Sequence, residues 1–433
     1  MRDGRKLASS ARAILNAGAE LPPDVVRAAT RSAAHTFKRD RDGPREDACV
    51  RSDTISLLAR VIVMSSSITH PPRTATRVER FETVVIGGGQ AGLAVGHHLA
   101  ARGVDHVILS DEARIGDNWR RRWDSLRLFT PARYSGLPGM PFPAPPGHLA
   151  DKDEVADYLE RYAARFDLPV RTGVRARSLE WDGTRYVIAV DGGSSLLEAD
   201  AVIVATGAFQ RPRIPRVSAR LSPTIVQIHS SEYRNPFELP DGPALIVGGG
   251  PSGAQIALEM ASLRKVWLAG RDTGHLPRRI LGRDLFDWLW PVMQRATADR
   301  WLGRRMRAGA RRGGDASIGL TQHDLRQAGI TRVGRLDEER GGLPLCGDVV
   351  LEPRVVVWCT GFESDYDWIH LPVFDEEGRP RQERGIAIDL PGLYFLGLHF
   401  QHRLSSSLLG GVGADAAFIA EQVARHCDAL AEV

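Results

Sequence analysis

The sequence of 433 residues has little cysteine. Its four cysteines, Cys49, Cys346, Cys359 and Cys427, form no CxxC pair and no metal-ligand spacing. This pattern argues against a disulfide framework and a metal site, and it predicts free thiols in a reducing compartment. The sequence also lacks an apolar run of about 18 residues, which a membrane-spanning helix needs, and a secretion signal. We therefore expect a cytoplasmic protein with no membrane span.

Neither sign of charge dominates, because 57 Lys and Arg stand against 53 Asp and Glu. Residues 1–80 hold 15 of these basic and 9 of these acidic residues, which leaves 42 basic and 44 acidic residues for the rest. The body of the protein therefore has no basic excess of the kind that favours DNA or RNA binding. We expect no nucleic-acid partner.

A chain of this length predicts two domains. Residues 1–79 are rich in Arg, Ala, Ser and Asp and carry no motif, so we expect a disordered or dispensable N-terminal extension. Met64 precedes a polar, proline-containing segment that is typical of the start of a shorter protein. Residues 1–63 are accordingly interpreted as an upstream extension.

A strand, a glycine-rich turn and a helix follow one another twice. Residues 83–86 are apolar and run into GGGQAG, and residues 244–247 run into GGGPSG. An apolar run ends at Gly207 in the first case and at Gly361 in the second, each about 110 residues after its turn, as an internal duplication would leave them. The pattern predicts two nucleotide-binding units.

Each glycine of such a turn has a physical role. The first permits the tight turn, the second lets the backbone approach a pyrophosphate, and the third lets the helix pack on the strand. The phosphate then lies at a helix N-terminus, where the N–H groups and the helix dipole favour an anion. The candidate binding residues are Gly87, Gly89, Gly92, Gly248, Gly250, Ser252 and Gly253. A glycine-rich turn without a ligand is the alternative for either one alone.

The residues after the next strand differ between the two units. The first unit reaches Asp111 and Glu112, and a carboxylate there accepts hydrogen bonds from a ribose, which suits the adenosine of FAD. The second reaches Arg271 at the same offset, where a guanidinium can bind a 2′-phosphate. The pattern favours NADP over NAD, and a solvated arginine at a strand end is the alternative.

These observations predict an α/β protein with two Rossmann-like dinucleotide-binding domains. Because the sequence after Gly361 still has a strand and a helix that need a sheet to join, we expect the NADP-binding domain to be inserted in the FAD-binding domain. The expected ranges are 80–212 for the first part of the FAD-binding domain, 213–350 for the NADP-binding domain, and 351–433 for the second part.

From about Phe81 to its end, the chain resembles the class B flavoprotein monooxygenases. This group includes the flavin-containing monooxygenases, the plant auxin-forming enzymes and the Baeyer–Villiger enzymes. The resemblance covers some four-fifths of the chain, and its motifs together are more specific than either glycine turn. The matching stretches are VVIGGGQAGLA, IGDNWRRRWDSLRLFTPARYSGLPGMPFP, VIVATGAFQRPRIP, IHSSEYRNP, ALIVGGGPSGAQIA, VWLAGR and VVVWCTGF.

The resemblance implies three contacts with the flavin. The motif GDNWR is similar to a loop that lies along FAD, with Trp119 and Arg120 as contacts, although cation–π packing is the alternative. Residues 128–131 resemble the segment beside the oxygen-reacting face. Residues 410–415, ending in Asp415, resemble the stretch that directs a helix N-terminus at the ring, where it stabilises negative charge.

The stretch around His229 is similar to the family fingerprint FxGxxxHxxxY. His229 and Tyr233 match, whereas Pro223 and Ile225 replace the Phe and the Gly. The resemblance implies that His229 and Tyr233 sense the bound nicotinamide nucleotide at the domain linker, and a plain hydrogen-bonding histidine is the alternative. Tyr233 also favours the flavin-containing monooxygenases over the Baeyer–Villiger group, whose fingerprint has Trp there.

Two further positions depart from the family. Ser110 stands where relatives often have the ribose-binding acid, and Phe129 stands where they have a polar residue near the flavin. These departures leave open a regulatory nucleotide-binding flavoprotein without oxygen transfer. A disulfide reductase, which shares the paired folds, needs a redox-active cysteine pair that the sequence lacks.

The resemblance implies that NADPH reduces FAD and that the reduced flavin forms a C4a-hydroperoxide with O2. One oxygen atom then passes to a substrate. Apolar residues near the flavin (Tyr134, Phe142 and Phe400) suit a small hydrophobic amine, sulfide or ketone, although they could equally belong to the core.

Overall fold

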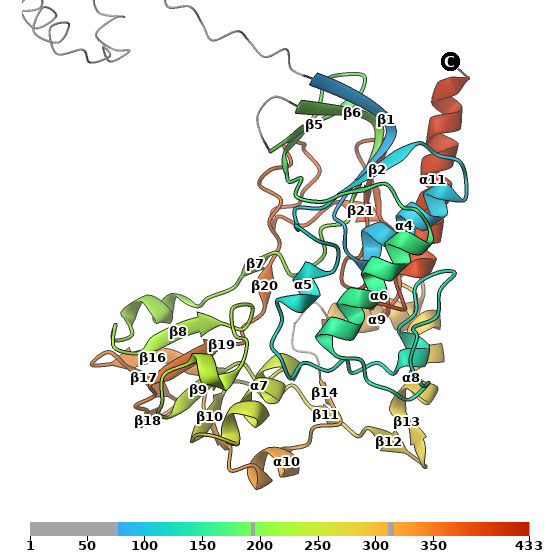
Figure 1. Cartoon of the computed structure of the whole chain (residues 1–433). Helices are drawn as coiled ribbons and strands as arrows, with labels where there is room; N and C mark the ends of the chain where they lie inside the picture. The colour runs from blue at the N-terminus through green and yellow to red at the C-terminus, as the bar shows by residue number, and fades with distance from the viewer. Residues whose placement is uncertain (1–76, 192–194, 311–315, 433) are drawn as a thin grey trace, which may run out of the picture. The chain divides into compact units, whose positions relative to one another are not determined.

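A computed structural model describes residues 77–191, 195–310 and 316–432. Cys49, Met64 and nearly all of the predicted N-terminal extension lie outside these residues. Within them, two separate sheets form the framework, a mixed one and an all-parallel one, each with helices packed on it (Figure 1). The fold is of the predicted α/β class.

The larger sheet has nine strands and contains the first glycine turn. Its order is β21-β22-β23-β6-β1-β2-β3, and β5 joins β4 to β6. β1 (Arg77–Ile86) lies between β6 (Ser195–Val204) and β2 (His106–Leu109), parallel to both. The last four residues of β1 are fully or almost fully buried, as expected of a central strand in a sheet covered on both faces.

Helices α4 (Gln90–Ala100), α6 (Lys152–Arg165) and α11 (Gly413–Ala431) bury their apolar faces in one hydrophobic core of this sheet. α6 starts at a capping box, in which the Asp151 carboxylate accepts from the N–H groups of Asp153 and Glu154. This cap fixes the residue at which α6 begins.

The smaller sheet has five parallel strands in the order β15-β10-β9-β19-β8. They are β15 (Thr331–Val333), β10 (Val266–Ala269), β9 (Ala244–Val247), β19 (Val355–Trp358) and β8 (Val226–His229). Helix α7 (Pro251–Ala261) follows β9 through the second glycine turn and packs on β10. This order places β9, which carries the turn, at the centre.

The remaining elements are short except for α8 and α9. Helices are α5 (Asp117–Arg120), α8 (Leu285–Arg295), α9 (Trp301–Ala310), α10 (Gln322–Gln327), η1 (Ala132–Tyr134), η2 (Arg216–Arg220) and η3 (Pro236–Glu238). Strands are β3 (Val170–Arg171), β4 (Ala176–Trp181), β5 (Tyr186–Val190), β7 (Arg211–Pro212), β11 (His275–Leu276), β12 (Arg279–Ile280), β13 (Arg283–Asp284), β14 (Ser317–Ile318), β16 (Leu336–Arg340), β17 (Leu343–Cys346), β18 (Val349–Val350), β20 (Phe362–Glu363), β21 (Gln382–Glu383), β22 (Ile386–Ala387) and β23 (Leu393–Phe395). None of the helices in the described ranges is long and apolar enough to cross a membrane.

Two strand assignments differ from the expected ranges. β1 starts at Arg77, inside the predicted extension 1–79, because residues 77–80 pair with β6. The sequence did not indicate this part of the strand, because three of its four side chains are polar. β19 lies within the predicted range 351–433 of the FAD-binding domain, yet it pairs with β8 and β9 of the smaller sheet. The chain returns to the larger sheet with β23, which pairs with β6.

His98 on α4 makes the stability of this fold sensitive to acid. Burial lowers the pKa of His98 to about 4, below the ordinary value of 6.5. The unfolded chain therefore binds a proton that the folded chain excludes, and stability is full above pH 6.5 and lost as the pH falls towards 4. We expect His98 to remove about 2 kcal/mol of unfolding free energy between pH 7 and pH 5.

Urea unfolding of His98→Gln at the two pH values checks this expectation. The variant should lose less stability on acidification than the parent, and His323→Gln, at an exposed position on α10, should behave like the parent. Equal losses in His98→Gln and the parent would contradict the assignment.

Candidate functional site

The first glycine turn is closed by two contacts that leave no space for a side chain. Gly87 has a φ of +122°, and a Cβ built on it would lie 2.4 Å from the carbonyl oxygen of Ala205. A Cβ on Gly92 would lie 1.9 Å from the carbonyl oxygen of Gly87. The backbone at the end of β6 and the start of α4 therefore approaches the turn as closely as the sequence predicts.

The second turn repeats this geometry. Gly248 also has a φ of +122°, and its Cβ would lie 2.1 Å from the carbonyl oxygen of Cys359, just after β19. A Cβ on Gly253 would lie 1.9 Å from the carbonyl oxygen of Gly248. The two glycine-rich motifs thus fold into the same strand-turn-helix structure.

The middle glycines face open space. Gly250 has no heavy atom within 4 Å of its ideal Cβ, and Gly89 has only Asn118 Nδ2, at 3.9 Å. Both residues are N-caps without a side-chain cap, at the starts of α7 and α4. Helix N–H groups directed into open space fit a pyrophosphate. We call each glycine turn, together with the open space at its helix N-terminus, a cradle. Ser252 is half-buried in the first turn of α7, beside this space.

Two further predicted glycines close the strands beside the turns. Gly207 follows β6 with a φ of +77°, and Gly361 follows β19 with a φ of +82°. Neither has a heavy atom within 4 Å of an ideal Cβ. Gly207 and Gly361 therefore each leave open space beside their glycine turn.

Of the two acids predicted to bind ribose, the structure favours Glu112. Its Oε1 pairs with Arg121, while its Oε2 is buried with no hydrogen-bond partner in the part of the chain that the structure describes. Asp111 is exposed. Ser110 is buried, and a Cβ on Gly88 would lie 2.6 Å from the Ser110 Cβ. The unpaired acceptor beside the first turn fits a ribose hydroxyl of FAD.

The second turn has a cation that the sequence analysis missed. Arg332, on β15, donates from Nη2 to the carbonyl oxygen of Gly270 (2.8 Å), and its Nη1 is buried without a hydrogen-bond partner among the described residues. A Cβ on Gly249 would lie 3.3 Å from that Nη1. The predicted Arg271 is exposed at the end of β10. An unsatisfied guanidinium nitrogen against the turn fits a phosphate of NADP.

The GDNWR motif is placed differently from the expectation. The guanidinium of Arg120 is held by Asp117, Asp157 and Glu160, at 3.2, 2.9 and 3.2 Å. Trp119 packs against the cores of both sheets. Asn118 is the member of the motif nearest the first turn. Arg120 and Trp119 therefore hold the loop in place, and Asn118 is the side chain directed at the cradle.

His229 is fully buried at the end of β8, beside the linker strand β20. Its Nδ1 accepts from the Ser231 N–H (3.2 Å), so the ring proton is on Nε2, which donates to the Gly361 carbonyl oxygen (3.0 Å). Its ring also meets the edge of the Phe362 ring, with centroids 4.9 Å apart. Burial lowers the pKa of His229, which keeps the ring neutral.

Tyr233 lies in the core of the smaller sheet, 1% exposed, and its hydroxyl donates to Glu259 on α7 (2.9 Å). Burial is the main cause that raises the pKa of Tyr233. His229 thus contacts Ser231 and Gly361, and Tyr233 contacts Glu259. A sensing role for His229 and Tyr233 stays a prediction, and the structure gives them positions that hold the linker and α7.

The N-terminus of α11 carries a buried carboxylate. Asp415 is 1% exposed, lies 3.5 Å from Arg403 Nη1, and burial raises its pKa. A Cβ on Gly397, in the segment that leads to α11, would lie 3.1 Å from the Ala91 Cβ at the start of α4. Gly397 therefore borders the start of α4, next to the first glycine turn, and the flavin contact at residues 410–415 stays a prediction.

A cavity of about 750 Å³ adjoins this segment. Its walls include Tyr134, Phe142, Trp290 of α8 and Gly410. The rings of Tyr134 and Trp290 stack at 5.1 Å, and the Phe129 ring stacks on Phe286 at 6.1 Å. Two of the three predicted apolar residues thus line the cavity. The third, Phe400, is 1% exposed and is not among the lining residues.

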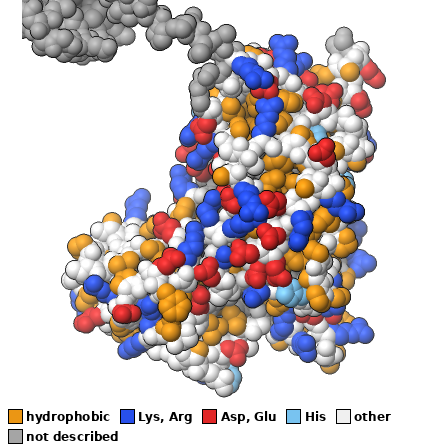
Figure 2. All heavy atoms as spheres, viewed as in Figure 1, with side chains coloured by type: hydrophobic (Ala, Val, Ile, Leu, Met, Phe, Trp, Pro, Cys, Tyr) orange, Lys and Arg blue, Asp and Glu red, His pale blue; other side chains and the backbone are white. Residues whose placement is uncertain are grey.

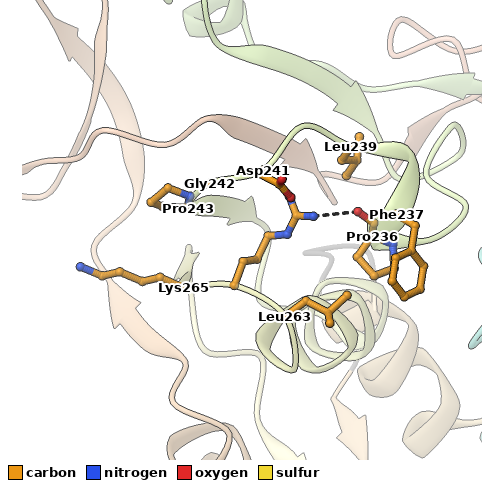
Figure 3. A pocket seen from close by; sticks show the side chains of 9 residues that line it. Pro236, Phe237, Leu239, Asp241, Gly242, Pro243, Leu263 and Lys265 are labelled. Carbon is orange, nitrogen blue, oxygen red and sulfur yellow. Dashed lines mark hydrogen bonds between the residues drawn. The ribbon is translucent and has the colours of Figure 1, made fainter.

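A second cavity, of about 540 Å³, lies at the other end of the smaller sheet (Figure 3). Pro236, Phe237, Pro243 and Leu263 line it, and Arg264 donates across it to the Pro236 carbonyl oxygen (2.7 Å). It adjoins the amino ends of β9 and β10, whereas nucleotides bind at the carboxyl ends of parallel strands. We exclude it as the cofactor site.

The three cysteines of the described residues do not form a redox pair. Cys346, Cys359 and Cys427 are all free thiols, and burial raises the pKa of Cys359 to about 12, so this thiol under the second turn stays protonated. The described ranges contain no group of three or more His, Cys, Asp or Glu that could hold a metal ion. Dinucleotide binding is the chemistry that the arrangement supports.

Comparison with known proteins decides the family. The profile of the pyridine nucleotide-disulphide oxidoreductases matches residues 84–295. The uncharacterized CzcO-like oxidoreductase of Geobacillus kaustophilus (strain HTA426) is 38% identical over 359 residues, covering 80% of this chain and 99% of the relative. A flavin-containing monooxygenase from Stenotrophomonas maltophilia is 27% identical with a TM-score of 0.67, covering 81% of this chain and 99% of that structure. The chain belongs to the family of the CzcO-like oxidoreductases, and its structure is similar to that of the flavin-containing monooxygenase.

The chain is therefore an oxidoreductase with two dinucleotide-binding domains, for FAD and NADP. The indole-3-pyruvate monooxygenase YUCCA1 of Oryza sativa subsp. japonica is a more partial relative, 33% identical over 52% of this chain and 56% of its own length. Solved structures under 25% identical, such as the OTEMO complex with FAD and NADP at a TM-score of 0.56, share the fold.

Alanine at the two open glycines tests the cradles. Gly89→Ala and Gly250→Ala meet no protein atom closer than 3.9 Å, so we expect both variants to fold normally. A methyl group in the pyrophosphate path should lower bound FAD in the first and weaken NADP binding about tenfold or more in the second. Flavin absorbance per chain and calorimetric titration with NADP measure the two effects.

The matched controls are Gly92→Ala and Gly253→Ala. Their methyl groups would lie 1.9 Å from a carbonyl oxygen, so these variants should lose folding stability before any ligand is added. Unchanged flavin content in Gly89→Ala would show that the first cradle does not hold the FAD pyrophosphate.

Proposed function

We propose that the protein transfers one oxygen atom from O2 to a small hydrophobic amine, sulfide or ketone, with NADPH as the reductant. The observation that carries this proposal is the cavity of about 750 Å³ lined by Tyr134, Phe142 and Trp290. It reaches Gly410, three residues before α11, whose leading segment borders the FAD cradle. An apolar substrate there would lie next to the flavin end of the site.

FAD, when bound and reduced by NADPH, supplies the oxygen-activating chemistry. The residues of the chain bind and orient the two nucleotides. Glu112 Oε2 would accept from the ribose of FAD, and the N-terminus of α4 would hold its pyrophosphate. Arg332 and Arg271 would hold the 2′-phosphate of NADP, which would give the enzyme a preference for NADPH over NADH.

The N-terminus of α11 contributes the positive end of its helix dipole and the proton of Asp415. Because burial raises the pKa of Asp415, its carboxyl group can hold a proton and donate a hydrogen bond to the flavin. The N-terminal dipole of α11 stabilises negative charge nearby. The aromatic walls of the cavity exclude water, which protects an oxygen-transferring site from unproductive reactions.

Oxygen isotope labelling tests the oxygen transfer. Purified flavin-loaded protein, NADPH and ¹⁸O2 are incubated with a panel of alkyl aryl sulfides, tertiary amines and cyclic ketones. We expect one labelled oxygen atom in the product per NADPH consumed for at least one class. Consumption of NADPH with hydrogen peroxide as the sole oxygen product across the panel would contradict the proposal.

Substitution of the two arginines tests the assignment of NADP. Arg332→Ala and Arg271→Ala should each raise the Kd for NADP by about 10- to 100-fold, because each loses a charge-assisted hydrogen bond to phosphate, and should leave the Kd for NAD unchanged. Calorimetric titration measures both constants. Arg340→Ala, at an exposed arginine of β16, is the control and should match the parent. Equal losses for NADP and NAD would refute the 2′-phosphate assignment.

A further inference from the structure

The outer face of α8 carries apolar residues where a surface helix normally has polar ones. Leu285, Phe286 and Met293 are buried on its inner side. Trp288 and Val292, one helical turn apart and flanking this buried side, are 46% and 44% exposed. The apolar surface of the helix therefore extends beyond the part that packs against the protein.

The adjacent hairpin of β12 and β13 exposes a leucine at its tip. Leu281 has a φ of +51° and is 87% exposed, and Gly282 follows it with a φ of +77°. Asn or Gly is the usual residue at such a turn, because a leucine with positive φ is strained. Leu281 thus serves neither the turn nor the core. Its exposure and its backbone together indicate a function outside the fold.

The hairpin and α8 form one surface (Figure 1). Trp288 Nε1 donates to the Ile280 carbonyl oxygen (3.4 Å), and the guanidinium of Arg283 lies 5.6 Å from the centre of the Trp288 ring. We call the exposed residues Ile280, Leu281, Trp288 and Val292 the apolar cap.

Basic residues surround the apolar cap. Residues 276–295, which contain the hairpin and α8, have four arginines and two aspartates, a net charge of +2. Arg279, Arg283 and Arg295 are exposed, and no carboxylate of the described residues lies within ion-pair distance of them. Hydrophobic and basic side chains lie side by side over β12, β13 and α8 at the lower right of Figure 2.

We propose that the apolar cap docks on an anionic lipid bilayer. Trp288 and Leu281 would enter the interface between headgroups and acyl chains, while the arginines contact lipid phosphates. A two-fold dimer through the cap would place the exposed Arg279, Arg283 and Arg295 of both copies against each other, which is unfavourable. Residues 1–80 have 15 basic and 9 acidic residues and would be repelled in the same way.

Docking would bring the lipid close to the substrate cavity. Trp290 lies on the same helix as Trp288 and lines the cavity of about 750 Å³. A hydrophobic substrate dissolved in the bilayer would then have a short path to the cavity. The docking itself rests on the surface of the protein and not on the proposed oxygen transfer.

Vesicle flotation of the full-length, flavin-loaded protein tests the proposal. The probes are vesicles of phosphatidylglycerol and phosphatidylcholine in equal parts, and vesicles of phosphatidylcholine alone. We expect binding to the first at low salt, weaker binding as NaCl is raised, and little binding to the second. Leu281→Asn should weaken binding about tenfold, because it removes one inserted leucine.

The variants separate docking from folding. Asn suits the positive φ of residue 281, so Leu281→Asn should keep or raise the melting temperature while it loses vesicle binding. Arg279→Gln with Arg283→Gln should remove most of the preference for anionic vesicles. Phe237→Ser, which removes a side chain that is 82% exposed on η3, should bind like the parent.

Two results would overturn the proposal. The first is vesicle binding that is unchanged in both Leu281→Asn and the double arginine variant. The second is a dimer, detected by light scattering, that Leu281→Asn dissociates, because the cap would then be an interface between two copies of the chain.

Discussion

The close approach of two helices to the strands that precede them is the constraint on which the rest of the structure depends. A carbonyl oxygen lies 1.9 Å from the place where Gly92, and likewise Gly253, would carry a Cβ. Only glycine lets α4 and α7 begin so near their strands, and this geometry directs both helix N-termini at the same kind of open space. The cofactor-binding residues then follow from what the neighbouring strands present at each turn. An acid stands at the first turn and arginines stand at the second.

The sequence predicted the framework because its signals are local. An apolar run, a glycine turn and an apolar helix lie within about 20 residues of one another, so both cradles and the acid after β2 could be located without a structure. Arg332 could not, because it reaches the second turn from β15, which is separated from that turn by more than 75 positions along the chain. A lone arginine on a short strand has no pattern of its own, and only the strand order β15-β10-β9 brings it to the turn.

The misplaced details have the same origin. Three carboxylates from α5 and α6 bind Arg120 of the GDNWR motif, and spacing alone does not reveal such long-range pairs. β19 falls in the range expected for the FAD-binding domain although it pairs with β8 and β9, because its apolar residues suit either sheet. The polar start of β1 was hidden for another reason. Arg80 reaches Glu198 on β6, a partner 118 residues away.

The linker between the two sheets is a short ribbon in which β7 pairs with β20. The guanidinium of Arg122 lies 5.6 Å from the ring centres of both Phe209 and Phe362, and burial lowers its pKa. His229 holds the residue before Phe362 through its ring proton. A swing of one nucleotide-binding domain against the other that moved Arg122 away from these rings would cost both cation–π contacts.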